Sequence, residues 1–129
     1  MVKMEEVTYE MFLSAINKIA DQIKDLDINS LYGVPRGGMV VAVYLSHATG
    51  LPVQEEWFDV NEKCLICDDI ADTGETLLPY KFNGFKIATI YYHKQSKVVP
   101  DIWIYEKKDE WIKFPWETNA STKNHQSVE

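Results

Sequence analysis

The stretch that decides the fold covers residues 63–77, KCLICDDIADTGETL. Its apolar run stops at two adjacent acids, Asp68 and Asp69, and a third acid, Asp72, precedes the turn-forming residues 73–76. This pattern predicts a buried strand that ends in carboxylates, followed by a tight turn that opens a helix. In an open α/β sheet, ligands bind at the carboxyl ends of the strands. We therefore expect a ligand site at this end of the strand.

The residue types at this site leave three interpretations open. Backbone N–H groups of residues 73–76 suit a phosphate, while Asp68 and Asp69 suit ribose hydroxyls or a hard cation such as Mg²⁺. A simpler interpretation is a strand that ends in solvated acids beside a helix cap. A phosphorylatable acid cluster of the response-regulator kind fits less well, because such clusters bring acids together from separate strands and these acids are contiguous.

The whole stretch resembles the phosphoribosyl pyrophosphate (PRPP) binding motif of type I phosphoribosyltransferases: apolar residues, two acids, two spacers, an acid and Thr-Gly-x-Thr. The resemblance implies that residues 73–76 anchor the 5′-phosphate and that Asp68 and Asp69 contact the ribose hydroxyls directly or through water. It also implies that Asp72, near purine N7, is the general base. The implied PRPP-binding residues are Asp68, Asp69, Ala71, Asp72, Thr73, Gly74, Glu75 and Thr76.

A second glycine-rich turn comes earlier, after a predicted strand over residues 27–34 and before a predicted helix over residues 39–49. Its two glycines let backbone amides approach an anion, and Arg36 adds a positive charge. Alone, such a sequence is more often a plain turn. It is similar to the pyrophosphate loop of the same family, which implies pyrophosphate binding and a cis Pro35–Arg36 bond. The implied residues are Pro35, Arg36, Gly37 and Gly38.

The base-binding residues are implied by resemblance to 6-oxopurine phosphoribosyltransferases. Lys94 follows a predicted strand over residues 85–92 and would hydrogen-bond the purine O6, with Lys97 as a weaker competitor. The segment WIKFPWE, residues 111–117, would usually be packing, yet it is similar to the C-terminal segment of the xanthine, guanine and hypoxanthine enzymes. By that similarity Trp111 stacks on the purine and the backbone of Ile112 contacts its edge.

The connection between the two motifs departs from the family. Residues 51–58 are predicted to form a short strand and residues 59–62 a tight link, whereas many members carry a long mobile loop near here that excludes water from the reaction. Either another segment or a neighbouring subunit shields the site, or the activity is reduced or lost. A predicted edge strand over residues 98–105 and a solvated turn over residues 106–110 complete the pattern.

Composition sets the remaining bounds. The 129 residues predict one phosphoribosyltransferase-like domain over residues 1–117 and a polar, flexible tail over residues 118–129. The net charge of −7 argues against nucleic acid and anionic lipid as partners. The chain has neither a long apolar run nor a secretion signal, so a cytoplasmic protein is expected. Cys64 and Cys67 form a C-x-x-C pair, which we interpret as strand residues rather than a zinc or redox site.

Together these features predict a Rossmann-like, mainly parallel α/β sheet with a small hood from the N-terminal helix, residues 8–24, and the C-terminal aromatic segment. The expected activity is transfer of a 5-phosphoribosyl group from PRPP to a 6-oxopurine in purine salvage. Mg²⁺ is the implied cofactor, with Asp68, Asp69 and, as a third candidate, Glu117 near it. A homo-oligomer, dimer or tetramer, is implied. The alternatives are a non-catalytic PRPP- or nucleotide-binding regulator, or an enzyme for another base.

Overall fold

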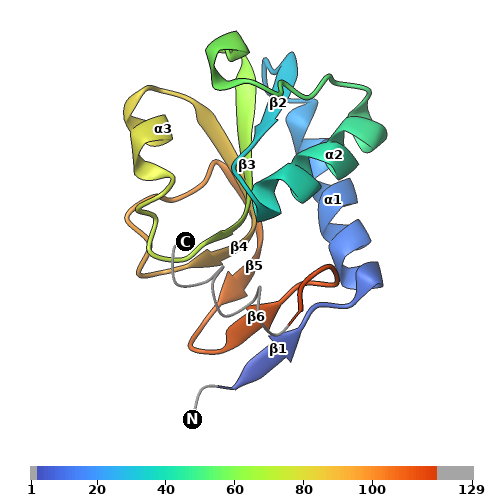
Figure 1. The fold of residues 1–129 in the computed structure, drawn as a ribbon, viewed down its shortest axis with the longest axis vertical. Helices are drawn as coiled ribbons and strands as arrows, with labels where there is room; N and C mark the ends of the chain where they lie inside the picture. Colours follow the sequence, from blue (N-terminus) through green and yellow to red (C-terminus); the bar gives the residue numbers. More distant parts are fainter. Residues whose placement is uncertain (1–2, 119–129) are drawn as a thin grey trace.

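A computed structural model describes residues 3–118 of the chain, so the predicted tail lies outside the described residues apart from Thr118. Helices and strands alternate along most of the chain (Figure 1). In chain order the elements are β1 Met4–Glu6, α1 Tyr9–Ile23, β2 Ser30–Gly33, α2 Gly37–Thr49, the 3₁₀ turn η1 Trp57–Asp59, β3 Cys64–Ala71, α3 Leu78–Phe82, β4 Lys86–His93, β5 Ile102–Lys107 and β6 Trp111–Lys113.

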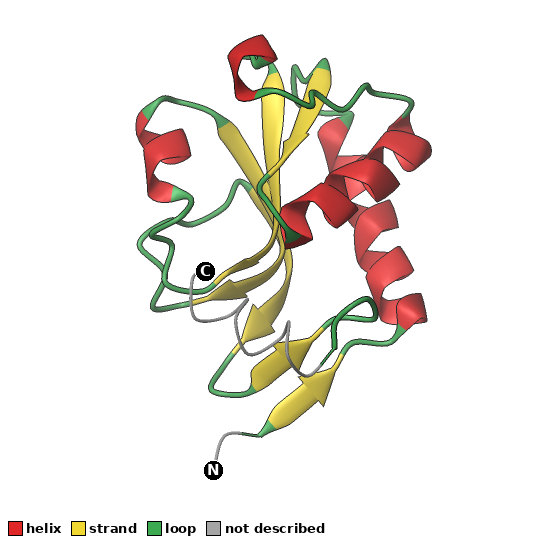
Figure 2. Cartoon of the chain, in the orientation of Figure 1, coloured by secondary structure: helices red, strands yellow, loops and turns green. Residues whose placement is uncertain are grey.

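The main sheet has four strands in the order β2-β3-β4-β5, and every neighbouring pair is parallel. Helices α1 and α2 cover one face and α3 lies on the other (Figures 1 and 2). Parallel strands need crossovers of this kind, which bury both faces of the sheet. The predicted mainly parallel α/β architecture is confirmed, and all four strands end at one carboxyl edge.

The core forms where the apolar pattern predicts it. All eight residues of β3 are buried, as expected for a central strand covered on both faces. Helix α1 begins after Thr8, whose Oγ1 accepts a hydrogen bond from the N–H of Met11. Its buried stripe includes Phe12, Ile16 and Ile19, each at most 2% exposed, and each such side chain contributes about 1.5–3 kcal/mol through burial.

A second, two-stranded sheet forms the hood. Strand β6 pairs in parallel with β1, a strand before α1 that the sequence did not predict. The hood is fixed to the main sheet through β4, because the Tyr91 hydroxyl donates to Glu5 Oε2 at 3.0 Å. The ring of Tyr91 also packs edge-on against Phe114. The C-terminal aromatic segment therefore lies against the β4–β5 half of the sheet.

Three local predictions were wrong. Residues 51–58 do not form a strand: only Val53 bridges Leu31, and a 3₁₀ turn follows. The helix expected to open near Gly74 begins at Leu78, with Pro79 in its first turn. Strand β5 continues to Lys107, into the predicted solvated turn, because pairing with β4 extends to the His93–Lys107 pair.

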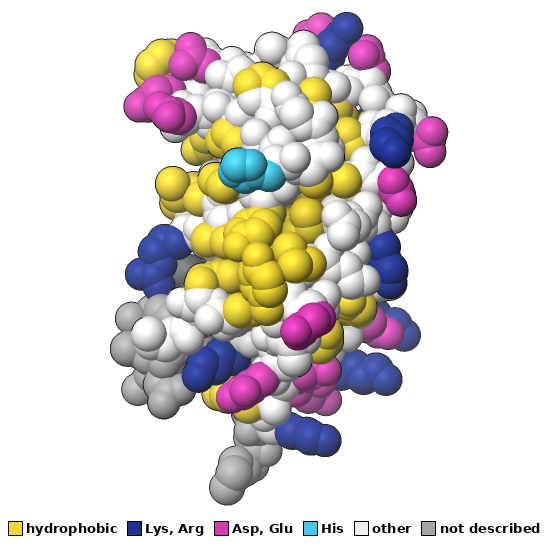
Figure 3. Space-filling view, turned by 90° about the vertical axis from the view of Figure 1, so that its right-hand side faces the viewer, with side chains coloured by type: hydrophobic (Ala, Val, Ile, Leu, Met, Phe, Trp, Pro, Cys, Tyr) yellow, Lys and Arg dark blue, Asp and Glu magenta, His cyan; other side chains and the backbone are white. Residues whose placement is uncertain are grey.

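Helix α2 is apolar on most of its surface, and part of that surface is exposed. Met39 and Val43 are 53% and 47% exposed, and apolar side chains gather on the α1–α2 side of the molecule (Figure 3). Within residues 3–118, no helix has the length and apolar character needed to cross a bilayer.

Candidate functional site at the carboxyl edge of the sheet

The loop of residues 72–76 leaves the end of β3 and is held by the segment that follows β4. Gly74 has φ +83°, and a Cβ at this position would lie 2.5 Å from Ser96 Oγ and 2.7 Å from the backbone nitrogen of Lys97. The N–H of Lys97 donates to the carbonyl of Thr73 at 2.8 Å. Glycine is therefore needed here for both backbone conformation and space, and the turn is a defined structure.

The loop of residues 35–38 leaves the end of β2 and lies against β3. A Cβ on Gly38 would overlap the carbonyl oxygen of Cys67 and lie 3.1 Å from the Cα of Asp68. The N–H of Val34 donates to that same carbonyl at 2.9 Å. The Pro35–Arg36 bond is cis, as the family resemblance implied. Helix α2 thus begins beside the acids of β3, with its N-terminal amides available to an anion.

Asp68 and Asp69 are both fully buried within β3, which continues past them to Ala71 rather than ending at the acids as predicted. Asp68 Oδ1 accepts a hydrogen bond from the N–H of Asp69, and Asp69 Oδ1 accepts one from the N–H of Ile70. Burial first, and then the charges of Cys64 and Asp68, raise the pKa of the Cys67 thiol well above its usual range. This pKa shift is the expected result of placing thiol and carboxylates together inside the sheet.

Asp72 lies at the edge itself, within a buried ion pair. Both of its carboxylate oxygens lie near Lys107 Nζ, at 3.3 and 3.4 Å, and Gln95 Nε2 donates to Oδ1 at 3.1 Å. The side chains of Asp72 and Lys107 are 10% and 8% exposed. The acid, the amide and the lysine come from the ends of β3, β4 and β5, so the sheet topology brings them together.

Comparison with known proteins shows what the fold is similar to. A purine phosphoribosyltransferase from Pyrococcus horikoshii superposes with a TM-score of 0.77 and 28% identity, over 89% of this chain and 95% of that one. No protein-family model matches the chain. The chain shares the fold of the type I phosphoribosyltransferases, and these likenesses support its resemblance to that family.

Two further members of the family differ in the base that their names state. The xanthine-guanine-hypoxanthine phosphoribosyltransferase of Helicobacter pylori shares the fold, with a TM-score of 0.75 and 22% identity over 96% of this chain and 99% of that one. An orotate phosphoribosyltransferase from Sulfurisphaera tokodaii is 29% identical over 83 residues, 54% of this chain. The match spans only 43% of that relative's length.

The three residues predicted to bind the base, Lys94, Trp111 and Ile112, have surroundings that differ from one another. Lys94 is 81% exposed, and its Nζ lies 3.6 Å from Glu106 Oε2. Trp111 is half-buried in β6, with its N–H donating to the carbonyl of Lys3, and Ile112 is fully buried beside it. Each lies on the β4–β5 side of the molecule, but the contacts of the Asp72 side chain come from Lys107 and Gln95 instead.

The sequence prediction missed Lys107 and Gln95. The predicted solvated turn includes Lys107, and none of the motifs includes Gln95. One signal was present: Lys107 lies two residues beyond the predicted edge strand of residues 98–105, so a longer β5 would end at the same edge as Asp72. Considering the strand ends together, rather than the motifs one by one, could have found this lysine.

The segment of residues 57–62, at the place of the family's mobile loop, is short and fixed by aromatic contacts. The centroid of the Trp57 ring lies 5.4, 5.1 and 5.5 Å from the ring centroids of Tyr32, Tyr80 and Phe85. Burial first, then the charges of Tyr32 and Asp68, raise the pKa of Tyr80. Phe58, in contrast, is 81% exposed.

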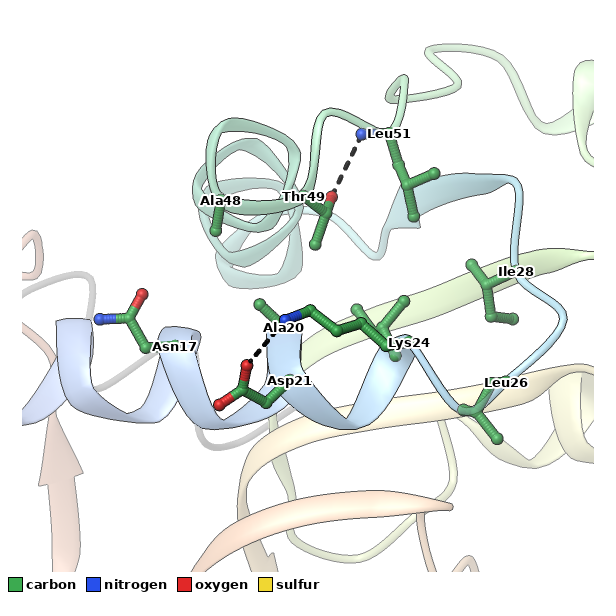
Figure 4. Close-up of a pocket in the computed structure, with 10 residues that line it drawn as sticks. Asn17, Ala20, Asp21, Lys24, Leu26, Ile28, Ala48, Thr49 and Leu51 are labelled. Atoms are coloured by element: carbon green, nitrogen blue, oxygen red, sulfur yellow. Dashed lines mark hydrogen bonds and ion pairs between the residues drawn. The ribbon is translucent and has the colours of Figure 1, made fainter.

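Two grooves flank the sheet at opposite edges. One of about 400 Å³ adjoins the 35–38 loop and includes Tyr32, Pro35 and Met39 in its lining. The other, of about 530 Å³, lies between the C-terminal ends of α1 and α2 (Figure 4). Asp21 and Lys24 form an ion pair on its wall. Because these helix ends lie at the amino edge, the second groove is separate from the candidate site at the carboxyl edge.

The donor chemistry near the site suits a hard cation only in part. Asp68 and Asp69 offer the oxygen atoms that Mg²⁺ prefers, but no group of three or more potential ligand side chains is found among residues 3–118. Glu117, the third candidate, is 8% exposed and its Oε1 accepts a hydrogen bond from the N–H of Phe114. A magnesium ion would therefore depend on the substrate for most of its ligands.

Proposed function

We propose that this chain transfers a 5-phosphoribosyl group from PRPP to a 6-oxopurine base, xanthine, guanine or hypoxanthine, in purine salvage. One observation carries the proposal: Gly38 packs directly on Cys67 and Asp68, so two loops with anion-binding geometry meet at one sheet edge. The similarity to a purine phosphoribosyltransferase over 89% of the chain supports it.

PRPP binding is divided between the two loops. The 5′-phosphate lies on the backbone amides and hydroxyls of residues 73–76, and the pyrophosphate lies on residues 35–38 at the start of α2. Arg36, which is exposed, supplies positive charge to the pyrophosphate. Asp68 and Asp69 contact the ribose hydroxyls, and since both are buried in this structure, this role would require the residues that cover them to move.

The reaction follows from where charge develops. The bond from ribose C1′ to a pyrophosphate oxygen breaks, a bond from C1′ to a base nitrogen forms, and the imidazole proton of the base passes to Asp72. The sugar carries oxocarbenium-like positive charge and the leaving group carries negative charge. Fixed amides and Arg36 stabilise the leaving group without reorganising during the reaction.

Mg²⁺, when bound with PRPP, would neutralise part of the pyrophosphate charge, with Asp68 and Asp69 contributing oxygens directly or through water. Glu117 remains a further candidate for this role. The base lies between Asp72 and the hood, where Trp111 stacks on it, Ile112 contacts its edge through the backbone, and Lys94 hydrogen-bonds O6. Stacking on one aromatic ring contributes about 1 kcal/mol.

A non-catalytic regulator is the second candidate, and one observation favours it. The segment of residues 57–62 is short, and Trp57 is fixed against three aromatic rings rather than forming a long mobile cover. An uncovered site admits water to a reactive sugar cation. For either function we propose a cytoplasmic homo-oligomer, and shielding by a neighbouring subunit would restore a closed site.

The test is incubation with PRPP, Mg²⁺ and one base at a time, with pyrophosphate release measured and the nucleotide identified by mass. Product from hypoxanthine, guanine or xanthine is expected. Product only from adenine or orotate would reassign the base. Calorimetric PRPP binding without product from any base would identify a regulator, and absence of PRPP binding would refute both.

A further inference from the structure

Lys107 is the feature at the carboxyl edge that the proposed roles do not use. Among residues 3–118 it is the cationic side chain that is buried, and it ends β5 opposite His93 of β4. β3 pairs with β4 as far as Ala71 and Tyr92, so β4 separates the strand of Asp72 from that of Lys107. The lysine side chain therefore extends over the end of β4 to reach the acid.

The contacts of Asp72 fix its carboxylate on two sides. Lys107 Nζ lies 3.3 Å from Oδ1 and 3.4 Å from Oδ2, while Gln95 Nε2 donates to Oδ1 alone at 3.1 Å. A single hydrogen bond lets a carboxylate rotate about its last torsion. The two donors come from different segments: Lys107 ends β5, and Gln95 lies in the turn after β4. Together they define one rotamer of Asp72, and its Oδ2 has fewer donors than Oδ1.

Glu110 lies three residues after Lys107, between β5 and β6. Partial burial acts to raise the pKa of Glu110. Hydrogen bonds from the N–H groups of Lys108 and Glu110 act to lower it, and so do the charges of Lys107 and His93. The lowering effects outweigh the burial. The pKa of Glu110 is consequently below its usual range. The buried charge of Lys107 is offset in part by its ion pair with Asp72.

We propose that Lys107, assisted by Gln95, is a positioning residue that holds the Asp72 carboxylate in one orientation for proton transfer from the base. This inference rests on the proposed function, because it gives Lys107 a role only through Asp72. General-base catalysis needs the accepting oxygen within hydrogen-bond reach of the proton. A displacement of about 1 Å at such a group can lower a rate by up to about 100-fold.

Loss of Lys107 should lower turnover and leave substrate binding unchanged. Lys107→Met keeps the length of the side chain and removes the charge, and we expect kcat to fall about 10-fold or more with the KM for PRPP within two-fold. Gln95→Met, at an exposed position where folding is not at risk, should lower kcat about three-fold. Lys108→Met is the matched control, since its side chain is exposed beside Lys107.

A double-mutant cycle identifies the route of the effect. If Lys107 acts through Asp72, Lys107→Met should change kcat less than two-fold when Asp72 is already Asn. Two outcomes overturn the inference and leave the proposed function intact. One is that Lys107→Met still lowers kcat 10-fold in the Asp72→Asn protein. The other is that kcat is unchanged in both Lys107→Met and Gln95→Met. A wild-type protein that is inactive with every base overturns both. If Lys107→Met does not fold, Gln95→Met and its own cycle with Asp72→Asn decide the question.

Discussion

The two halves of the carboxyl edge are built in different ways. The half that we propose binds the phosphate groups, residues 35–38 and 68–76, is called the phosphate half, and its backbones and glycines make the contacts between its segments. The half that we propose binds the base, the ends of β4 and β5 with the hood, is called the base half, and it is assembled from charged and aromatic side chains of separate segments. Backbone sites tolerate few substitutions but need few residues, whereas side-chain sites can change specificity by one substitution.

Asp72 belongs to both halves, and its substitution should have the largest effect. Asp72→Asn removes the proton acceptor and should lower kcat about 100-fold or more, since general-base catalysis contributes factors of this size. Steady-state rates with hypoxanthine and calorimetric PRPP affinity would measure it. Asp109→Asn, a fully exposed acid nearby, is the control. Full turnover in Asp72→Asn with normal ligand binding would exclude the general-base role.

A substitution at Gly38 tests the packing of the phosphate half. Gly38→Ala places a Cβ against the Cys67 carbonyl. Urea titration should show a free energy of unfolding that is lower by about 1–3 kcal/mol. The PRPP affinity should be at least 10-fold weaker.

The control for Gly38→Ala is Gly50→Ala. Gly50 has φ +79°, and a Cβ added there would meet no other atom within 4 Å, so this variant should lose only about 1 kcal/mol from backbone strain and keep its PRPP affinity. Equal PRPP affinities for the two variants would contradict the packing argument.

The strand beneath the phosphate half should respond to alkaline pH. Burial raises the pKa of Cys67 in the folded state above its unfolded value, so this contribution to stability is complete below about pH 8.5 and is lost as pH rises. The loss should reach about 2 kcal/mol by pH 10. Urea unfolding at pH 7 and 10 should show a smaller decline in Cys67→Ala than in the wild type, and an identical decline would refute the assignment.

The base half should show a smaller and more selective effect at Trp111. Trp111→Ala removes a stacking surface worth about 1 kcal/mol, so the KM for the base should rise about five-fold with PRPP affinity unchanged. Trp103→Ala is the matched control, because Trp103 packs on Tyr92 and has no proposed contact with the base. Equal KM values for Trp111→Ala and the wild type would place the base elsewhere.

This contrast also explains how much could be predicted from sequence. The phosphate half follows from two short motifs because its contacts are local, and the parallel sheet follows from the spacing of apolar runs. The ion pair of Asp72 and Lys107 joins residues 35 positions apart and depends on where β5 ends. Residues 51–58 have a strand-like composition, but the aromatic packing of Trp57 outweighs that local preference.

The short, fixed segment at residues 57–62 has one more consequence. A reactive ribosyl cation that is open to bulk solvent can be captured by water in place of the purine, which would yield ribose 5-phosphate and consume an energy-rich precursor without product. Association with another subunit that covers Phe58 and the neighbouring rim would exclude water from the site. It would therefore reduce the loss of PRPP to hydrolysis and favour transfer to the base.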